Sequence, residues 1–414
     1  MNQKPPIFII SGKSPKEDSG GYPAYAYSLS RILGELDYKV IALGVGKKEL
    51  ISKDKFGEIR ILDAGPLKHI PVLKHLALAG LPYYSYIFAK EIKRIVEKKK
   101  LKKFLLWGMG PWGFPAFLLK LSPPKNVKMI LITSYFTSTR HEMEGAYKAI
   151  NIRDYGFLPK IRYFLVYEII ARIFYIFEKL TLDYCDLIVI HYNSSRKIIK
   201  KHFGINPKKL FIFPWYTEIF KRKVKDTVVK ISFSHPLIVS ISRQDPRKGI
   251  NYIIRAIKIV SQQIPNVKCM IVGTGSFYKL NKKLVNKLGL SKIIEMPGFV
   301  ADINPILKQT DVAVIVPLRQ GSSALTVFEA MSYGKAIVAS NTDGIPEDLE
   351  NNKSALIVPA ANEEKTAEAI IKIISNKKLK KRLEKNCEKR FNTRFGYKKT
   401  KEALKKILDT QIKS

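Results

Sequence analysis

The sequence predicts an α/β fold of two domains, each built on a parallel sheet. At the start of the chain, the apolar run Ile7 to Ile10, the helix-period segment Tyr25 to Leu36 and the apolar run Val40 to Leu43 form a strand–helix–strand unit. A second strand–helix series begins at Leu237 to Ile241, after the polar and basic segment Phe220 to Asp226. A chain of 414 residues also exceeds the length that one hydrophobic core usually serves.

Apolar runs of strand length continue through the first half of the chain. Phe104 to Trp107, Met129 to Thr133 and Leu187 to His191 are short and mostly aliphatic or aromatic. Such runs are typical of strands that are buried on both faces of a parallel sheet. We therefore predict that they join the strand at Ile7 to Ile10 in one sheet.

Composition limits the classes of function. The chain has 73 Lys and Arg against 35 Asp and Glu, a formal net charge of +38 that favours anionic partners. No helix-turn-helix, zinc-finger or RNP-like pattern occurs, so we expect no nucleic-acid partner, although a basic scaffold that binds by charge alone is a competing interpretation.

Cys185, Cys269 and Cys387 form no C-x-x-C pair, which argues against zinc and against a disulfide framework. The run Ile7 to Ile10 is too short for a signal peptide, so we expect a cytoplasmic protein.

The segment Leu318 to Glu347 has the pattern of an anion-binding loop followed by a helix. The small loop residues are Ser322, Ser323 and Ala324. The first N–H groups of a helix lack intrahelical acceptors and lie at the positive end of its dipole. We therefore expect the N–H groups of Leu325, Thr326 and Val327 to face an anion. Glu329, one turn further, is placed to accept hydrogen bonds from vicinal hydroxyls.

Two cations stand upstream of this segment. Arg243 and Lys248 follow the apolar run Leu237 to Ile241 and precede a helix pattern, so we expect both at the carboxyl end of a strand. Cations beside a helix start suit a pyrophosphate leaving group. No D-x-D pattern, the carboxylate pair that holds a divalent ion in metal-dependent transferases, occurs in the chain, so we expect no metal ion. We also expect no cofactor.

These segments resemble the C-terminal half of the retaining nucleotide-sugar glycosyltransferases of family 4, the glycosyl transferases group 1. The resemblance spans residues 236–375 and rests on the motif order Arg243…Lys248-Gly249, Val272-Gly273-Thr274-Gly275, Gly298-Phe299-Val300, Asp311-Val312 and Glu329-Ala330-Met331…Gly344-Ile345-Pro346-Glu347. It implies the GT-B fold, in which two Rossmann-like doubly wound domains face each other across a cleft. We accordingly assign residues 1–220 to an acceptor-side domain, 221–395 to a donor domain and 396–414 to a helix that returns to the first domain.

The resemblance also implies roles for single residues. Arg243 and Lys248 would bind the diphosphate, and Glu329 would bind the ribose hydroxyls. The residues that would shape the base and ribose end of the site are Gly273, Gly275 and Val300. The family pattern places an acidic residue eight positions before the ribose Glu, where this chain has Gly321. That departure removes a carboxylate expected near the transferred sugar.

In the first domain, two features point to the same ligand. Gly20 and Gly21 follow the first strand, where glycine lets the backbone approach a ligand, and the resemblance implies that this pair lines the cleft. Family members often carry a His-centred motif after the strand equivalent to Met129 to Thr133, but this chain reads Ser134-Tyr135-Phe136. The nearest histidine, His141, would contact a sugar or acceptor hydroxyl, or else lie in a solvated loop.

Two segments bear on a membrane. Ile161 to Leu180 is apolar nearly all round, but ionisable residues break it before the roughly 18 apolar positions that a bilayer requires. We predict a core helix, with a membrane-dipping face as the alternative. Pro71 to Lys103 joins apolar and aromatic residues to a Lys/Arg-rich helix, which suits an anionic membrane interface or a solvated surface.

Together with the resemblance, which implies retention of configuration, the sequence predicts a metal-independent hexosyltransferase. Its partners would be a nucleotide-sugar donor and a glycan or lipid-linked acceptor, and it would be peripheral on the inner face of a membrane. The alternative is a catalytically silent relative that binds a nucleotide sugar without transferring it, which Gly321 would explain. These motifs do not specify the base, the sugar, the acceptor or the linkage.

Overall fold

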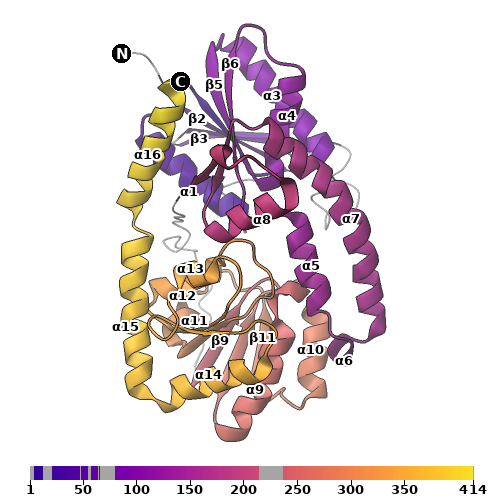
Figure 1. Cartoon of the computed structure of the whole chain (residues 1–414), viewed down its shortest axis with the longest axis vertical. Helices are drawn as coiled ribbons and strands as arrows, with labels where there is room; N and C mark the ends of the chain where they lie inside the picture. Colours follow the sequence, from indigo (N-terminus) through magenta and orange to yellow (C-terminus); the bar gives the residue numbers. More distant parts are fainter. Residues whose placement is uncertain are drawn as a thin grey trace. The chain divides into compact units, whose positions relative to one another are not determined.

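The computed structural model describes residues 4–12, 21–46, 48–54, 57–63, 65, 80–213 and 236–413. The chain divides into two compact units, each with its own sheet (Figure 1). The first unit comprises Met1–Phe136, Ile173–Ile219 and Tyr397–Ser414, and the second comprises Thr137–Arg172 and Phe220–Gly396. The predicted linker, Phe220 to Asp226, lies outside the described residues.

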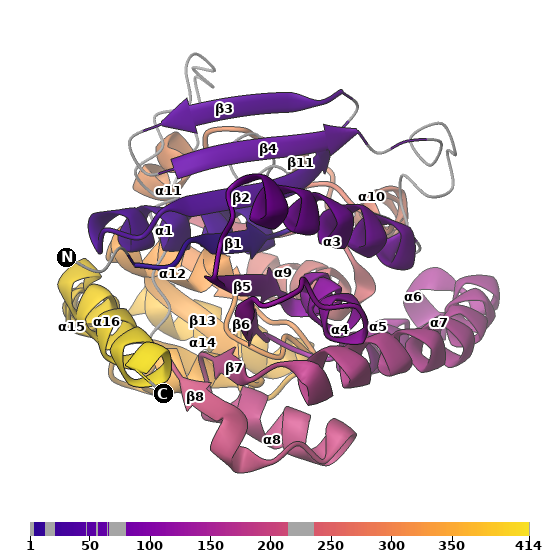
Figure 2. The ribbon, with the colours of Figure 1, turned by 90° about the horizontal axis from the view of Figure 1, so that it is seen from above.

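The first unit contains an eight-stranded sheet in the order β3-β4-β2-β1-β5-β6-β7-β8 (Figure 2). Every pairing is parallel except that between β3 and β4. The central strands are apolar because helices cover both of their faces. The strands are β1 Ile7–Ile10, β2 Val40–Gly46, β3 Leu50–Asp54, β4 Gly57–Asp63, β5 Lys103–Met109, β6 Lys128–Ser134, β7 Leu187–Ile190 and β8 Leu210–Ile212.

The last helix of the chain, α16 (Tyr397–Lys413), belongs to this first unit. Leu404 and Leu408 on its inner side are fully buried, and Lys401 pairs with Glu35 at 3.0 Å. Other described helices of the unit are α1 Gly21–Glu35, α3 Leu81–Lys98, α4 Pro115–Leu121 and α8 Asn193–Phe203, together with residues 173–184 at the end of α7 (Phe157–Tyr184).

The second unit contains a six-stranded parallel sheet in the order β11-β10-β9-β12-β13-β14. The chain winds in one direction from β9 through β10 to β11 and then returns to the other side of β9 at β12. In such sheets, ligands bind outside the carboxyl ends of the strands where the order reverses, here β9 and β12. The strands are β9 Leu237–Ile241, β10 Lys268–Val272, β11 Ile294–Gly298, β12 Val312–Ile315, β13 Ala336–Ser340 and β14 Leu356–Val358.

Helices cover this sheet and bury a large aliphatic core. The helices are α9 Ile250–Gln263, α10 Tyr278–Lys287, α11 Asn304–Gln309, α12 Leu325–Ser332, α13 Ile345–Asp348, α14 Glu363–Ser375 and α15 Lys377–Arg394. In the motif segment Gly344 to Glu347, Gly344 is the N-cap of the short helix α13, and the other three residues belong to that helix.

An inserted segment, residues 137–172, packs on the second unit. It holds α5 (Thr139–Ala149), α6 (Ile152–Tyr155) and the first part of α7 (Phe157–Tyr184). The fully buried carboxylate of Asp154 accepts hydrogen bonds from Asn251 at 3.1 Å and from the guanidinium of Arg255. The predicted division at residue 220 had placed this segment in the first domain. The second boundary, between Arg172 and Ile173, falls inside helix α7, so no turn or loop marks it in the sequence.

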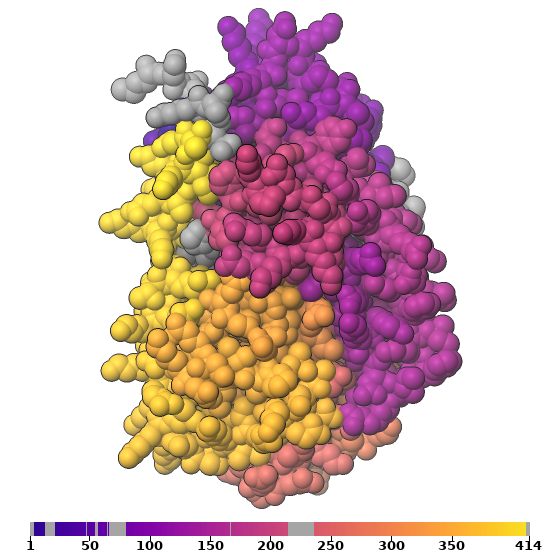
Figure 3. Space-filling view, viewed as in Figure 1, coloured from indigo at the N-terminus to yellow at the C-terminus, as the bar shows by residue number. Residues whose placement is uncertain are grey.

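Helix α7 differs from the core helix predicted for Ile161 to Leu180. One of its faces is largely exposed, and its atoms are visible at the surface in the space-filling view (Figure 3). The exposed apolar residues are Phe157, Leu158, Ile161, Phe164, Leu165, Ile169, Ile173 and Ile176. A helix that is apolar all round does not reveal from its sequence which face will be covered. Among the described residues, no helix combines the length and apolarity needed to cross a membrane.

Candidate functional site

The residues of the candidate site in the second unit lie where three strands end. Arg243 and Lys248 follow β9, the loop of residues 317–324 follows β12, and Asp343 follows β13. This edge includes the point where the strand order reverses, which is where ligands bind in sheets of this type.

The two predicted cations have different surroundings. The Arg243 side chain is 64% exposed, and its Nε lies 2.5 Å from a carboxylate oxygen of Asp245. Lys248 is half-buried, and its Nζ donates to Oε1 of Gln320 at 2.5 Å. Burial, reinforced by the positive charge of Arg247, lowers the pKa of Lys248 well below its usual value. Lys248 is therefore a cation whose charge an anionic ligand would stabilise.

A third cation, Arg247, was not singled out from the sequence. Its side chain is only 9% exposed and lies 3.2 Å from a carboxylate oxygen of Glu142 on α5. It also donates to Oε1 of Gln320 at 3.3 Å. Arg247 thus connects the inserted segment to the loop after β12.

The start of α12 agrees only in part with the predicted anion site. The N–H group of Val327 donates to the carbonyl of Ala324 at 2.9 Å, so this donor already has an acceptor, and its contact with a ligand stays a prediction. Among the described residues, no acceptor is recorded for the N–H groups of Leu325 and Thr326. In the loop before them, Ser322 Oγ donates to the Ser323 carbonyl at 3.2 Å.

Ser323 supplies a further hydrogen-bonding group at this edge of the sheet. Its residue is 1% exposed, and its Oγ has no hydrogen-bond partner among the described residues. The Oγ of Ser242, directly after β9, is also buried without a partner there. Buried hydroxyls without partners are uncommon because each costs about 1–3 kcal/mol. A polar ligand at this edge would satisfy both.

Glu329 lies in the second turn of α12, where the sequence placed it. The residue is half-buried, and no hydrogen bond or ion pair of its carboxylate is recorded within the described part of the chain. Burial raises the pKa of Glu329 to about 7. An unpaired carboxyl group with such a pKa is suited to accept hydrogen bonds from a ligand's hydroxyls.

Close packing accounts for two of the predicted glycines. A Cβ atom on Gly273, whose φ is +117°, would lie 2.0 Å from the Ser242 carbonyl oxygen, and one on Gly275 would lie 2.6 Å from that of Gln244. Glycine is thus required at both positions whether or not a ligand touches them. Val300 packs on an apolar cluster that contains Val239. Contact of these three residues with a donor stays a prediction.

In the first unit, Gly21 is the first residue of α1, the first helix after β1, whereas Gly20 lies outside the described residues. A role in donor binding stays a prediction for both.

His141 is not in a solvated loop. It lies in the first turn of α5, where Oγ of Ser138 caps its N–H group at 3.1 Å. Its Nε2 lies 3.1 Å and 3.0 Å from the two carboxylate oxygens of Asp343. Sequence reasoning missed Asp343, whose only local signal is its position directly before Gly344.

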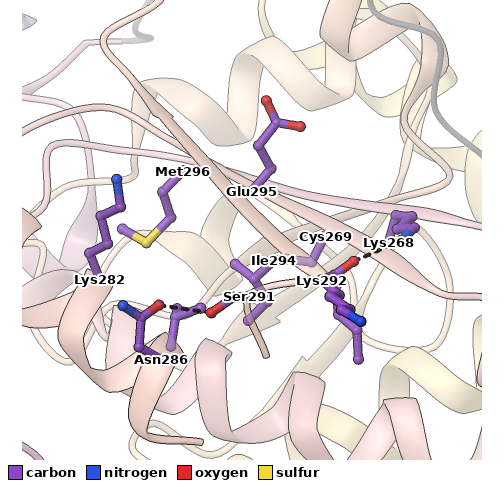
Figure 4. A pocket seen from close by; sticks show the side chains of 11 residues that line it. Lys268, Cys269, Lys282, Asn286, Ser291, Lys292, Ile294, Glu295 and Met296 are labelled. Carbon is purple, nitrogen blue, oxygen red and sulfur yellow. Dashed lines mark hydrogen bonds between the residues drawn. The ribbon is translucent and has the colours of Figure 1, made fainter. Parts of the chain in front are cut away.

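The sequence predicted no metal ligands. The described residues contain no group of three or more His, Cys, Asp or Glu side chains able to hold a metal ion. A pocket of about 390 Å³ lies elsewhere in the second unit, between α10 and the amino ends of β10 and β11 (Figure 4). Lys268 at its edge donates to the Lys292 carbonyl at 2.8 Å, and Ser291 donates to Asn286 at 2.8 Å. The donor residues follow the opposite, carboxyl ends of the strands, so this pocket is separate from the candidate site.

Residues 223–390 match the family model described as Glycosyl transferases group 1. The match covers 168 of the 414 residues, less than half of the chain. The matched residues include the cations after β9, the loop after β12 and Glu329 on α12, whereas the inserted segment lies outside them. An uncharacterized glycosyltransferase of Methanocaldococcus jannaschii is 27% identical over 188 residues, which are 43% of this chain and 45% of the relative. The match therefore spans less than half of that relative's length.

Solved structures resemble the whole chain. Sucrose-phosphate synthase from Thermosynechococcus elongatus has a TM-score of 0.78 and 19% identity, with 99% of both chains covered. The Anabaena protein HepE, solved in complex with UDP-glucose, has a TM-score of 0.66 and 14% identity, with 98% of this chain and 99% of that chain covered. At these identities the likeness concerns the fold, and it confirms the predicted GT-B fold of two Rossmann-like α/β domains.

Proposed function

We propose that this protein transfers a hexose-type sugar from a nucleotide diphosphate sugar to an acceptor hydroxyl, with retention of configuration and without a metal ion. The observation that carries the proposal is the site at the carboxyl ends of β9 and β12. There, two cations accompany a helix start whose first N–H groups have no recorded acceptor, and Glu329 has no recorded partner. The group 1 family match and the UDP-glucose bound to HepE support this assignment.

The chemistry of the site follows from the charge that develops on the leaving group. As the bond between sugar and phosphate breaks, negative charge grows on the diphosphate. Lys248 and Arg243 are positioned to stabilise that charge, together with the roughly half positive charge at the start of α12. Ser323 Oγ and the N–H groups of Leu325 and Thr326 supply further donors. The proposed donor therefore has its diphosphate at the start of α12 and its ribose near Glu329.

Nucleotide sugars are expected to raise the melting temperature of the purified protein, because a ligand that binds only the folded state stabilises it. The measurement is a thermal shift with UDP-glucose, GDP-mannose and related donors, followed by transfer assays and NMR assignment of the product anomer. Activity is expected to survive EDTA. Loss of activity on chelation, restored by Mg²⁺ or Mn²⁺, would contradict the metal-free mechanism. Donor binding with no transfer to any glycan or lipid-linked acceptor would instead favour the silent relative.

We also propose that the protein contacts an anionic membrane, as a lipid-linked acceptor would require. The apolar part of the predicted segment Pro71 to Lys103 lies mostly outside the described residues, but Lys98, Lys99 and Lys100 at the end of α3 are all exposed. The exposed apolar face of α7 gives a second contact, flanked by the exposed basic residues Arg162 and Arg172. An apolar helix face beside basic side chains suits the interface of an anionic bilayer.

Binding to anionic vesicles is expected to be reversible and to weaken with salt, because surface charges are screened over roughly 8 Å at physiological ionic strength. Replacing Lys98, Lys99 and Lys100 by Glu should reduce sedimentation with vesicles strongly, and so should replacing Leu165 and Ile169 by Gln.

The matched control for charge is the triple change to Glu at Lys377, Lys378 and Lys381, which are exposed on α15. Lys380 is unsuitable because it is half-buried and pairs with Asp311. Equal losses of vesicle binding in the two triple variants would mean that the binding is nonspecific electrostatic attraction. A concentration-dependent mass that the α7 changes abolish would show that α7 covers a second copy of the chain instead.

A further inference from the structure

A carboxylate lies against Gly321, the position at which the sequence lacks an expected acidic side chain. It belongs to Asp343, in the loop after β13. Its Oδ2 atom accepts hydrogen bonds from the N–H groups of Gln320 and Gly321, both at 2.6 Å. The carboxylate thus reaches the loop after β12 from a neighbouring strand, 22 residues further along the chain.

The backbone at both positions is adapted to this contact. Gly321 has a φ of +80°, in the left-handed region that glycine adopts without strain. Asp343 has a φ of +47°, which is uncommon for a residue with a side chain. A left-handed residue costs roughly 1–2 kcal/mol unless it is glycine, although Asp tolerates it better than most. The surrounding structure therefore stabilises Asp343 in an unfavourable backbone conformation that places its carboxylate at this point.

The Asp343 carboxylate is ionised and keeps capacity for a ligand. Burial alone would raise its pKa, but the hydrogen bond and charge attraction from His141, with the N–H groups of Gly321 and Gln320, outweigh burial and hold the pKa below its usual value. Among the described residues, Oδ1 contacts only Nε2 of His141, at 3.1 Å. A carboxylate oxygen can accept about two hydrogen bonds, so Oδ1 retains one acceptor site. The side chain is 11% exposed.

The position of this charge divides the proposed site. The Gln320 side chain accepts a hydrogen bond from Lys248, and the Gln320 backbone N–H donates one to Asp343. A single residue therefore links the Asp343 carboxylate to Lys248, which we propose binds the diphosphate. The two N–H groups that Asp343 occupies are not available to a phosphate. The negative charge of the carboxylate would also repel a phosphate at this point. The diphosphate therefore belongs beside Lys248 and α12, and a neutral part of the donor belongs beside Asp343.

We propose that Asp343, held by His141 and the loop N–H groups, is a specificity residue that accepts a hydrogen bond from a hydroxyl of the transferred sugar and excludes sugars that carry a carboxylate. The inference rests on the proposed function. It restricts the donor class to neutral or amino sugars. It also assigns His141 a positioning role, because its imidazole orients the Asp343 carboxylate.

The test compares three ligands by calorimetric titration: UDP, UDP-glucose and UDP-glucuronic acid, or the corresponding set for whichever base the wild-type protein binds. Wild-type protein is expected to bind the neutral nucleotide sugar at least tenfold more tightly than the acidic one. Asp343→Asn should weaken binding of the neutral sugar nucleotide roughly tenfold to hundredfold, the effect of losing a hydrogen bond to a charged group, and should leave UDP binding almost unchanged. The ratio of the affinity for the neutral nucleotide sugar to that for the acidic one should decrease by a similar factor.

Two further variants distinguish this role from a structural one. Asp154→Asn is the matched control, because Asp154 is a fully buried carboxylate of the same unit that pairs with Arg255 away from the loop after β12. It should lower the melting temperature without changing the ratio of the three affinities. His141→Gln should shift the ratio in the same direction as Asp343→Asn, but less. An Asp343→Asn variant that stays folded with an unchanged ratio would overturn the proposal. A wild-type protein that binds no nucleotide or nucleotide sugar would instead refute the proposed function, and this inference with it.

Discussion

Replacement of Lys248 by Ala is expected to lower turnover by about 100-fold or more while weakening binding of the donor much less. Removing one preorganised donor from a site where negative charge develops typically costs about 100- to 1,000-fold in turnover. Lys248 is half-buried and its pKa is lowered by burial, so its charge is desolvated and acts strongly on a neighbouring diphosphate. Because charge on the diphosphate grows as the bond breaks, the loss should fall mainly on kcat.

Arg243→Ala should have the same sign and a smaller size. Its side chain is 64% exposed and already pairs with Asp245, so solvent and that carboxylate weaken its action. Steady-state kcat and KM for both variants give the comparison. Lys335→Ala is the control, since Lys335 is a half-buried lysine at the amino end of β13 that donates to the Lys308 carbonyl at 2.8 Å. A Lys248→Ala variant that raised KM with kcat unchanged would contradict selective stabilisation of the leaving group.

Replacement of Glu329 by Gln is expected to weaken nucleotide-sugar binding by about 1.5–3 kcal/mol, the contribution of hydrogen bonds to a charged group. Since no partner of the Glu329 carboxylate is recorded among the described residues, the loss should appear in calorimetric titration of the donor and not in folding. Unchanged donor affinity in a folded variant would exclude Glu329 from the site.

The same substitution should change how stability depends on pH. The pKa of Glu329 is about 7 in the folded protein and about 4.5 when the chain is unfolded. Between these values the folded state keeps a proton that the unfolded state releases, so this group makes the free energy of unfolding fall as pH rises from about 4.5 to 7. The free energy of unfolding falls by at most about 3 kcal/mol over this range. The fall should be smaller than this limit because the side chain is partly exposed. Glu329→Gln removes it.

Urea denaturation of both proteins at pH 5 and pH 8 measures this effect. The free energy of unfolding of Glu329→Gln minus that of wild type should be larger at pH 8 than at pH 5. Contributions of groups common to both proteins cancel in this difference. An equal difference at the two pH values would mean that Glu329 is ionised in the free protein. Donor binding to wild type should release a proton near pH 7, because ribose hydroxyls stabilise the charged carboxylate.

The sequence by itself determined the inner strands of the first sheet and the first strand of the second. The bounds predicted for the strands at Ile7 to Ile10 and Leu237 to Ile241 are those of β1 and β9. Strands buried on both faces of a parallel sheet need continuous apolar runs, which are local and visible in the chain. The positions of Arg243, Lys248 and Glu329 followed in the same way, because each lies a fixed number of residues after a strand end or a helix start.

Only the tertiary structure decided which side chains meet. His141 and Asp343 are 202 residues apart, and no period or motif connects them. Their contact requires α5 to pack on the second unit, and the sequence does not mark that helix as belonging there. The exposed face of α7 is a further case, because a helix that is apolar on every side specifies burial without specifying which side is buried. Local patterns fix where a chain bends and which segments avoid water, whereas pairing between distant side chains depends on the three-dimensional packing of the whole unit.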